Sequence, residues 1–261
     1  MTRPVLTLTN AGGPEGAPLV VLGDSLGTST ILWDEVVPAL RVRFRVRAFD
    51  LPGHGVSPAA GDAFTVADLA DALAAEIAEP FHYAGVSLGG AVGLELALRH
   101  PSLVRSATII ASGAKIGTAE GWHERAAQVR QQSTSSLIIA SAGRWFAPDT
   151  IAGNPDLTGR LLHSLRDADA ESYARCCEAL AAHDVRDRLG EITVPVLAVW
   201  GGHDEVTPEA LAREIADGVV HGRAAGIPGA AHLPPADDPD ATATVIADFV
   251  SEIERTADDT A

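Results

Sequence analysis

The sequence predicts an α/β fold, in which a mostly parallel sheet has helices on both faces and a helical segment is inserted late in the chain. Short apolar runs typical of buried strands alternate with runs in which apolar residues recur every three or four positions, as on one face of a helix. The alternation stops near residue 117 and resumes near residue 190. We therefore expect a core formed by residues 1–116 and 190–261 and an inserted helical cap formed by residues 117–189.

The alternation can be followed along the chain. Strands are expected where the runs are apolar or alternate with polar residues, at 5–9, 18–22, 43–49, 81–86, 103–111, 194–200 and 222–227. Core helices are expected at 33–40, from Thr65 to 77, at 88–100, 208–216 and 240–255, and Thr65 with Asp68 forms a capping-box pattern. The inserted segment shows only helical patterns, at 118–132, 136–146, 156–167 and 170–182.

Composition limits the possible partners. The chain has 261 residues and a formal net charge of -16, which argues against binding to nucleic acid or to an anionic membrane. An anionic substrate would need a local cation for the same reason. The two cysteines, Cys176 and Cys177, are adjacent, which fits a reducing compartment rather than a disulfide framework. There is no apolar signal core and no run of 18 apolar residues, so we expect a cytoplasmic protein; the oligomeric state is left open.

One motif dominates the chain. Gly85-Val-Ser87-Leu-Gly89 fits the G-x-S-x-G nucleophile elbow, in which a serine lies on a sharp turn between a strand and a helix. The flanks agree, since a strand-like run precedes the motif and a helical run ended by Pro101 follows it. The glycines on either side of the serine allow the strained turn and the close passage of the chains. The sequence therefore predicts Ser87 as a catalytic nucleophile.

A serine nucleophile needs a base and a carboxylate that orients the base. In the fold that carries this elbow, the acid and then the histidine follow the serine in the chain. Asp204 follows the strand expected at 194–200, and His232 follows the last expected strand, so we assign them as the acid and the base. Glu205 is a rival for the acid.

Two backbone N–H groups must stabilise the oxyanion. One is expected from Leu88, the residue after the nucleophile. The other should come from the loop after the strand at 18–22, where we choose Leu26, with Ser25 as the alternative.

With these residues in place, the whole chain resembles an α/β-hydrolase, and within that superfamily it resembles the 3-oxoadipate enol-lactonases of the β-ketoadipate pathway. Asp24 and Pro52 depart from the Asn and Arg usual in that family, and neither change affects the catalytic residues. Beyond the elbow, the more specific segments are 24–28 with 32–34, and in the cap 143–148, 173–180 and 183–187.

The resemblance implies hydrolysis of a small carboxylate-bearing enol-lactone through an acyl-enzyme, with no metal and no organic cofactor. Arg144 is the candidate partner of the substrate carboxylate, with Arg175 as an alternative. Trp145 and Trp33 are candidate walls of the substrate pocket, beside Ser25. Two purely structural interpretations stay open, in which Arg144 is a solvated cap residue and Trp145 only packs the cap on the core.

Other functions use the same catalytic residues. General carboxylesterases, cofactor-free haloperoxidases and C–C bond hydrolases differ from enol-lactonases in the cap. Haloalkane dehalogenases and epoxide hydrolases have an aspartate at the elbow, so Ser87 argues against both. A non-catalytic ligand receptor on the same scaffold is the alternative from outside the enzymes.

Overall fold

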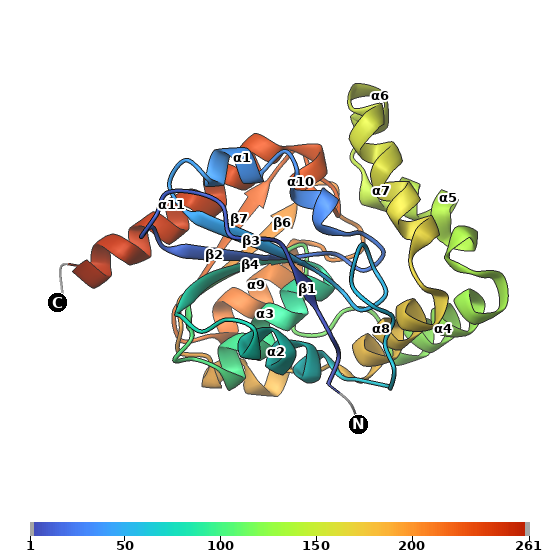
Figure 1. Cartoon of the computed structure of the whole chain (residues 1–261), viewed down its shortest axis with the longest axis horizontal. Helices are drawn as coiled ribbons and strands as arrows, with labels where there is room; N and C mark the ends of the chain where they lie inside the picture. Colours follow the sequence, from blue (N-terminus) through green and yellow to red (C-terminus); the bar gives the residue numbers. More distant parts are fainter. Residues whose placement is uncertain (1–2, 259–261) are drawn as a thin grey trace.

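The computed structural model describes residues 3–258 and is built on one seven-stranded sheet with the strand order β1-β3-β2-β4-β5-β6-β7 (Figure 1). All neighbouring strands are parallel except β1 and β3, which are antiparallel. The strands are β1 (Thr7–Leu8), β2 (Leu19–Gly23), β3 (Arg45–Asp50), β4 (Phe81–Val86), β5 (Val104–Ile110), β6 (Val196–Gly201) and β7 (Gly222–Ile227).

Helices cover both faces of the sheet, as the alternation predicts. In Figure 1, α1 (Val37–Leu40) and α11 (Pro239–Asp258) lie above the sheet. Below it lie α2 (Val66–Ala75), α3 (Leu88–Arg99) and α9 (Glu209–Gly218). The short helix α10 (Pro234–Asp237) follows β7 and precedes α11. None of the helices within residues 3–258 combines the length and the apolar character needed to cross a membrane.

Between β5 and β6, the described chain forms helices only. We call residues 117–189 the cap. Helices α4 and α8 lie side by side near the sheet, and α5, α6 and α7 extend away from them (Figure 1). The cap helices are α4 (Ala119–Gln132), α5 (Ile138–Trp145), α6 (Thr150–Gly153), α7 (Pro155–Asp167) and α8 (Ala170–Ala182).

Two expected helices are split in the structure. The helix expected at 33–40 is a 3₁₀ turn (Thr30–Trp33) followed by α1, which carries a proline in its first turn. The helix expected at 136–146 is a 3₁₀ turn (Thr134–Leu137) followed by α5. Helices α6 and α10 and a 3₁₀ turn at Arg186–Glu191 were not predicted, because segments of four to six residues are too short to show a helical period.

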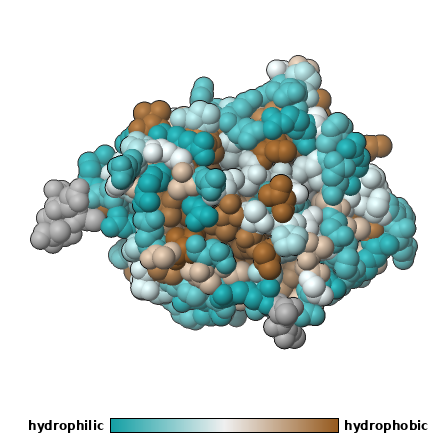
Figure 2. Space-filling model, viewed as in Figure 1, coloured by the Kyte–Doolittle hydropathy of each residue, from teal (hydrophilic) through white to brown (hydrophobic). Residues whose placement is uncertain are grey.

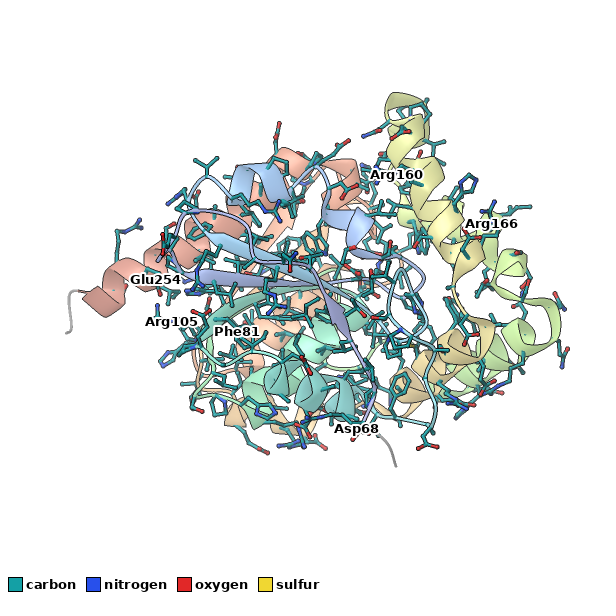
Figure 3. The ribbon with its side chains drawn as sticks, in the orientation of Figure 1. Asp68, Phe81, Arg105, Arg160, Arg166 and Glu254 are labelled. Carbon is teal, nitrogen blue, oxygen red and sulfur yellow. The ribbon has the colours of Figure 1, made fainter. Side chains whose placement is uncertain are left out.

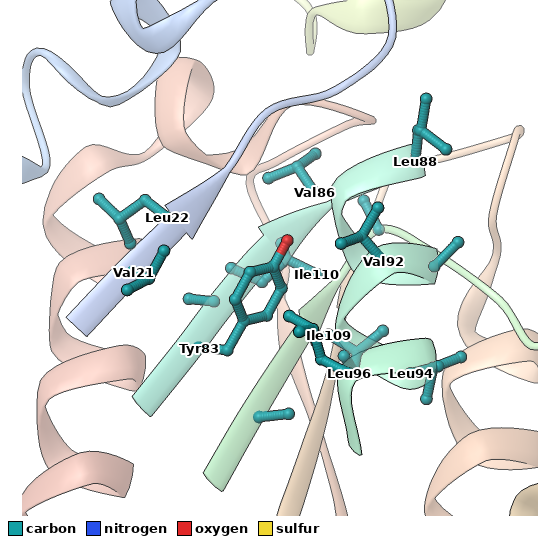
Figure 4. Packing of buried hydrophobic residues seen from close by; sticks show 14 of the residues in the cluster. Val21, Leu22, Tyr83, Val86, Leu88, Val92, Leu94, Leu96, Ile109 and Ile110 are labelled. Carbon is teal, nitrogen blue, oxygen red and sulfur yellow. The ribbon is translucent and has the colours of Figure 1, made fainter. Parts of the chain in front are cut away.

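The core lies on both sides of the sheet, and its packing fixes the serine turn. Tyr83 projects from β4 between β2 and α3, among residues that include Val21, Val92 and Ile109 (Figure 4). Its hydroxyl donates a hydrogen bond to the carbonyl of Gly89, at 2.7 Å. The side of the molecule drawn in Figure 2 is mostly hydrophilic, with hydrophobic patches between the polar residues.

At the opposite end of the strands, Ser106, His82 and Glu254 form a chain of contacts that resembles a catalytic triad. The His82 ring lies 2.8 Å from the Ser106 hydroxyl and 3.0 Å from the Glu254 carboxylate, and Arg105 also pairs with Glu254 (Figure 3). Ser106 and His82 have no exposed surface. A substrate therefore cannot reach them. The contacts instead join α11, which carries Glu254, to strands β4 and β5.

Candidate active site

The turn at Ser87 is strained and held from several sides. Ser87 has φ +55°, a conformation that is uncommon outside glycine. Its N–H donates to Ile110 in β5 at 2.9 Å, and the Ser112 hydroxyl donates to its carbonyl at 2.7 Å. A Cβ on Gly85 would lie 2.4 Å from the Gly89 carbonyl oxygen, so no larger residue fits there. The turn therefore projects the serine at the carboxyl end of β4.

The strand order explains where the site forms. The chain runs from β2 to β3 on one side and then returns to β4 on the other side of β2. Where the connections from neighbouring strands run in opposite directions across the sheet, the loops diverge and leave a crevice at the carboxyl ends of the strands. Here the Gly89 N–H donates to the Asp24 carbonyl at 3.1 Å, which joins the start of α3 to the loop after β2.

Asp204 and His232 lie within hydrogen-bonding distance across the loops after β6 and β7. The His232 Nδ1–H donates to Asp204 Oδ2 at 3.0 Å, because a carboxylate can only accept. The Thr207 hydroxyl donates to the same oxygen at 2.5 Å, and the N–H groups of Val206 and Thr207 donate to Oδ1. Burial opposes ionisation of Asp204, but the hydrogen bond and charge of His232 and the hydrogen bonds of Thr207 outweigh it and lower the pKa of the carboxyl. The rival Glu205 is exposed and lies outside this arrangement.

Two backbone amides are available beside the serine. Within residues 3–258, neither the Leu26 N–H nor the Leu88 N–H has a hydrogen-bond acceptor in the protein. The loop after β2, which carries Leu26, is shaped by Gly27, which has φ +90°, and by Thr28, which donates twice to the Ser25 carbonyl. Leu26 and Ser25 both line the cavity described next.

A cavity of about 130 Å³ lies between the core loops and the cap. Ser87 and His232 both line it, and so do Trp145 and Arg144. A cavity of about 150 Å³ in another protein accommodates benzene, so this one has room for about one small ring. The other lining residues include Gly117, Thr118, Trp122, Arg125, Tyr173 and Val206.

Two arginines face this cavity without an acidic partner. Among the described residues, neither Arg125 nor Arg144 forms an ion pair. Arg125 stacks over the Trp122 ring at 5.1 Å, and Arg144 donates to the Ala140 carbonyl at 3.1 Å. Burial and the nearby charge of Arg125 lower the pKa of Arg144. Two like charges therefore lie at one small cavity with no acidic partner among the described residues.

The structure separates the other candidates. Trp145 is buried, lines the cavity and also lies close to Gly27 in the core, so its role in substrate binding stays a prediction. Trp33 is fully buried elsewhere, where its indole N–H donates to Asp24 at 3.0 Å, and the expectation that it walls the pocket is wrong. Arg175 does not line the cavity and pairs with Glu171 and the Ala60 carbonyl.

Arg125, Trp122 and Tyr173 line the cavity but were not predicted from the sequence as site residues. Trp122 and Arg125 lie three residues apart on the helix expected at 118–132, which places them on one face. That spacing was visible, but nothing in the sequence indicated which face of α4 turns toward Ser87. No group of three or more His, Cys, Asp or Glu side chains within residues 3–258 is arranged to hold a metal ion.

Comparisons with known proteins show the family and the fold of the chain. Residues 20–245 match a family model described as "Alpha/beta hydrolase family". The chain is 37% identical to 3-oxoadipate enol-lactonase 1 of Acinetobacter baylyi over 201 residues, which are 75% of this chain and 74% of that protein. It is 33% identical to a pimeloyl-[acyl-carrier protein] methyl ester esterase of Neisseria meningitidis over 247 residues, 92% of this chain and 96% of that protein. The crystal structure of an enol-lactonase from Burkholderia xenovorans LB400 matches with a TM-score of 0.89 at 32% identity, covering 94% of this chain and 96% of that one.

Proposed function

Because the chain belongs to the alpha/beta hydrolase family, we propose that it is a carboxylic-ester hydrolase acting on a small anionic enol-lactone. The proposed reaction opens 3-oxoadipate enol-lactone to 3-oxoadipate in the degradation of aromatic compounds. The observation that carries the proposal is the pair of arginines without acidic partners, Arg125 and Arg144, in one small cavity with Ser87 and His232. The enol-lactonases among the similar proteins support the same choice.

In this proposal Ser87 is the nucleophile, His232 the base and Asp204 the acid that orients it. The Asp204 carboxylate accepts the Nδ1 proton, so the other ring nitrogen of His232 is free to take the serine proton. The N–H groups of Leu26 and Leu88 form the oxyanion hole in this proposal, because both lie beside the serine and have no acceptor among the described residues.

The arginines bind the carboxylate of the substrate, and Trp145 with Trp122 provides apolar walls for the lactone ring. The need for cations follows from the net charge of -16, which otherwise repels an anion. Ser25 lines the same cavity, in the loop after β2 that carries Leu26.

The chemistry proceeds in two halves. The Ser87 oxygen bonds to the lactone carbonyl carbon while His232 takes the hydroxyl proton. Collapse breaks the bond to the ring oxygen, which leaves as an enol after receiving that proton and remains attached through the carbon chain. The enol tautomerises to the ketone. Water, deprotonated by His232, then cleaves the acyl-enzyme, releases the acid and restores Ser87.

Methyl ester hydrolysis is the second candidate, because the Neisseria esterase is about as similar to this chain. Both reactions use the same catalytic residues and differ in the size of the acyl group. A cavity of about 130 Å³ suits one ring better than an extended seven-carbon chain attached to a carrier protein. Size therefore favours the lactone.

Steady-state turnover of three substrates tests the proposal. We expect kcat/KM for enzymatically generated 3-oxoadipate enol-lactone to exceed that for p-nitrophenyl acetate and for monomethyl pimelate. Cleavage of the esters but not of the lactone would support a hydrolase and reject the enol-lactone as its substrate. Binding of the lactone with no turnover of any substrate would favour the receptor.

A further inference from the structure

The cap is joined to the loop that carries His232 by hydrogen bonds on both sides of the histidine. We call residues 145–147 the cap strap and residues 228–233 the histidine loop. The Leu233 N–H donates to the Trp145 carbonyl at 3.0 Å. On the other side of the histidine, the Ala231 N–H donates to Asp237 Oδ2 at 2.7 Å, and the Ala147 N–H of the cap strap donates to Asp237 Oδ1 at 2.9 Å.

Asp237 is therefore a bridge between two segments far apart in the sequence. Each of its two oxygens accepts one backbone N–H, one from the cap strap and one from the histidine loop. The short helix α10 turns the chain back on itself, with the Asp237 N–H donating to the Leu233 carbonyl at 3.1 Å. Prolines 234 and 235 restrict this turn, which holds the carboxylate in place.

The bridge is partly desolvated, so its hydrogen bonds matter. Burial raises the pKa of Asp237, and the N–H donors of Ala231 and Ala147 oppose the rise. Thr150 of α6 and His203 of the loop after β6 also face the carboxylate. Hydrogen bonds to a charged group contribute more than those between neutral groups, and an amide left without its acceptor here is costly.

The same strap also builds the substrate cavity. Trp145 supplies a wall of the cavity with its side chain and accepts from Leu233 with its carbonyl. Movement of the cap strap away from the core would therefore open the cavity and break the bond from Leu233, on one side of His232. It would also remove the Ala147 N–H from the Asp237 carboxylate that accepts from Ala231, on the other side of His232.

We propose that Asp237 is a positioning residue that makes closure of the cap and placement of His232 one event. The inference rests on the proposed function only in that His232 is taken as the base. It implies that the enzyme with an open cap is inactive even toward a small ester that needs no contact with the cap. When the cavity is open and water can enter, His232 is therefore not placed to activate Ser87.

Amide hydrogen exchange tests the bridge without a substrate. In the unmodified protein, the N–H groups of Ala147 and Ala231 should exchange through the same opening and show equal protection. In Asp237→Asn, one oxygen is replaced by an NH₂ group, which faces an N–H donor and cannot accept from it. Because the proposal couples the two bonds through one opening, both amides should exchange faster. Asp238→Asn is the matched control, because Asp238 only caps α11 through the Ala241 N–H and asparagine caps equally well.

Kinetics distinguish positioning from general destabilisation. With the active sites counted by titration, Asp237→Asn should lower kcat for p-nitrophenyl acetate by about ten- to a hundredfold, since a displacement of about 1 Å can cost that much. Asp238→Asn should match the unmodified enzyme.

Unequal protection of the two amides in the unmodified protein would overturn the proposal, and this result needs no variant to fold. Faster exchange in Asp237→Asn with unchanged kcat would also overturn it. If the enol-lactone proves not to be a substrate, the exchange experiment and the ester kinetics still decide the role of Asp237.

Discussion

Removing the charge of Arg125 or Arg144 should separate anionic from neutral substrates. Arg125→Met and Arg144→Met keep most of the side-chain length and remove only the guanidinium. Neither arginine has an acidic partner among the described residues, so no carboxylate of the protein is left unpaired by the change. The effect should therefore fall on the substrate carboxylate rather than on folding.

The size of the effect follows from the surroundings. A unit charge pair at about 4 Å is worth about 4 kcal/mol near a protein surface, and solvent that reaches these half-buried side chains reduces this. A hydrogen bond to a charged group contributes about 1.5 to 3 kcal/mol. Each variant should therefore lower kcat/KM for the enol-lactone by about 10- to 150-fold. The value for p-nitrophenyl acetate should change little.

The assay compares both substrates in each variant and in Arg166→Met as a control. Arg166 lies on α7, pairs with Asp167 and does not line the cavity (Figure 3). Equal losses for the anionic lactone and the neutral ester would refute the reasoning, because they would show that the arginines support the structure rather than the carboxylate. Unchanged lactone turnover in both variants would refute it as well.

Two further predictions concern stability. Burial and the charge of Asp50 raise the pKa of Asp24 well above 3.8, and its Oδ2 has no partner within the described residues, so the folded state resists ionisation. Stability should fall as the pH rises above 3.8, and Asp24→Asn should be more stable than the unmodified protein at about pH 8 in urea titrations, with a smaller difference at about pH 4. A difference that does not depend on pH would count against this assignment. Hydrogen bonds from Arg130 and then Arg175 lower the pKa of Glu171 to about 2, so the stability from this pairing of α4 with α8 should be lost as the pH falls from 4.5 through about 2. Glu171→Gln should show less of this acid loss, and equal acid sensitivity would contradict the prediction.

The fold class was predictable because its signals are local and repeated. Strand β4 is found at the predicted residues Phe81–Val86, and β7 at Gly222–Ile227. The capping box at Thr65 and Asp68 forms as its pattern predicts. The resemblance to the enol-lactonases is confirmed by the similar proteins.

The candidate site was only partly predictable. The positions of Ser87, Asp204 and His232 follow from motifs at the ends of strands, and the structure brings Asp204 and His232 together. Their catalytic roles remain predictions. The cavity walls depend on how the cap helices rotate and pack, which a helical period does not determine. This is why Arg125 was missed and Trp33 was wrongly placed in the pocket.

Asp237 illustrates the same limit. It is an acidic residue in a short proline-rich segment, and no pattern marks it. Its two acceptors meet amides that are 90 and 6 residues away in the chain. Only the tertiary structure brings those amides to one carboxylate.

The most direct test of the account is the mass of the acyl-enzyme. Opening of a lactone by Ser87 loses no leaving group, so the quenched enzyme should gain the mass of the whole lactone on the peptide that contains Ser87. The Ser87→Ala variant should show no adduct and lose turnover by several orders of magnitude. An adduct on another residue, or hydrolysis that persists in Ser87→Ala, would contradict the central claim.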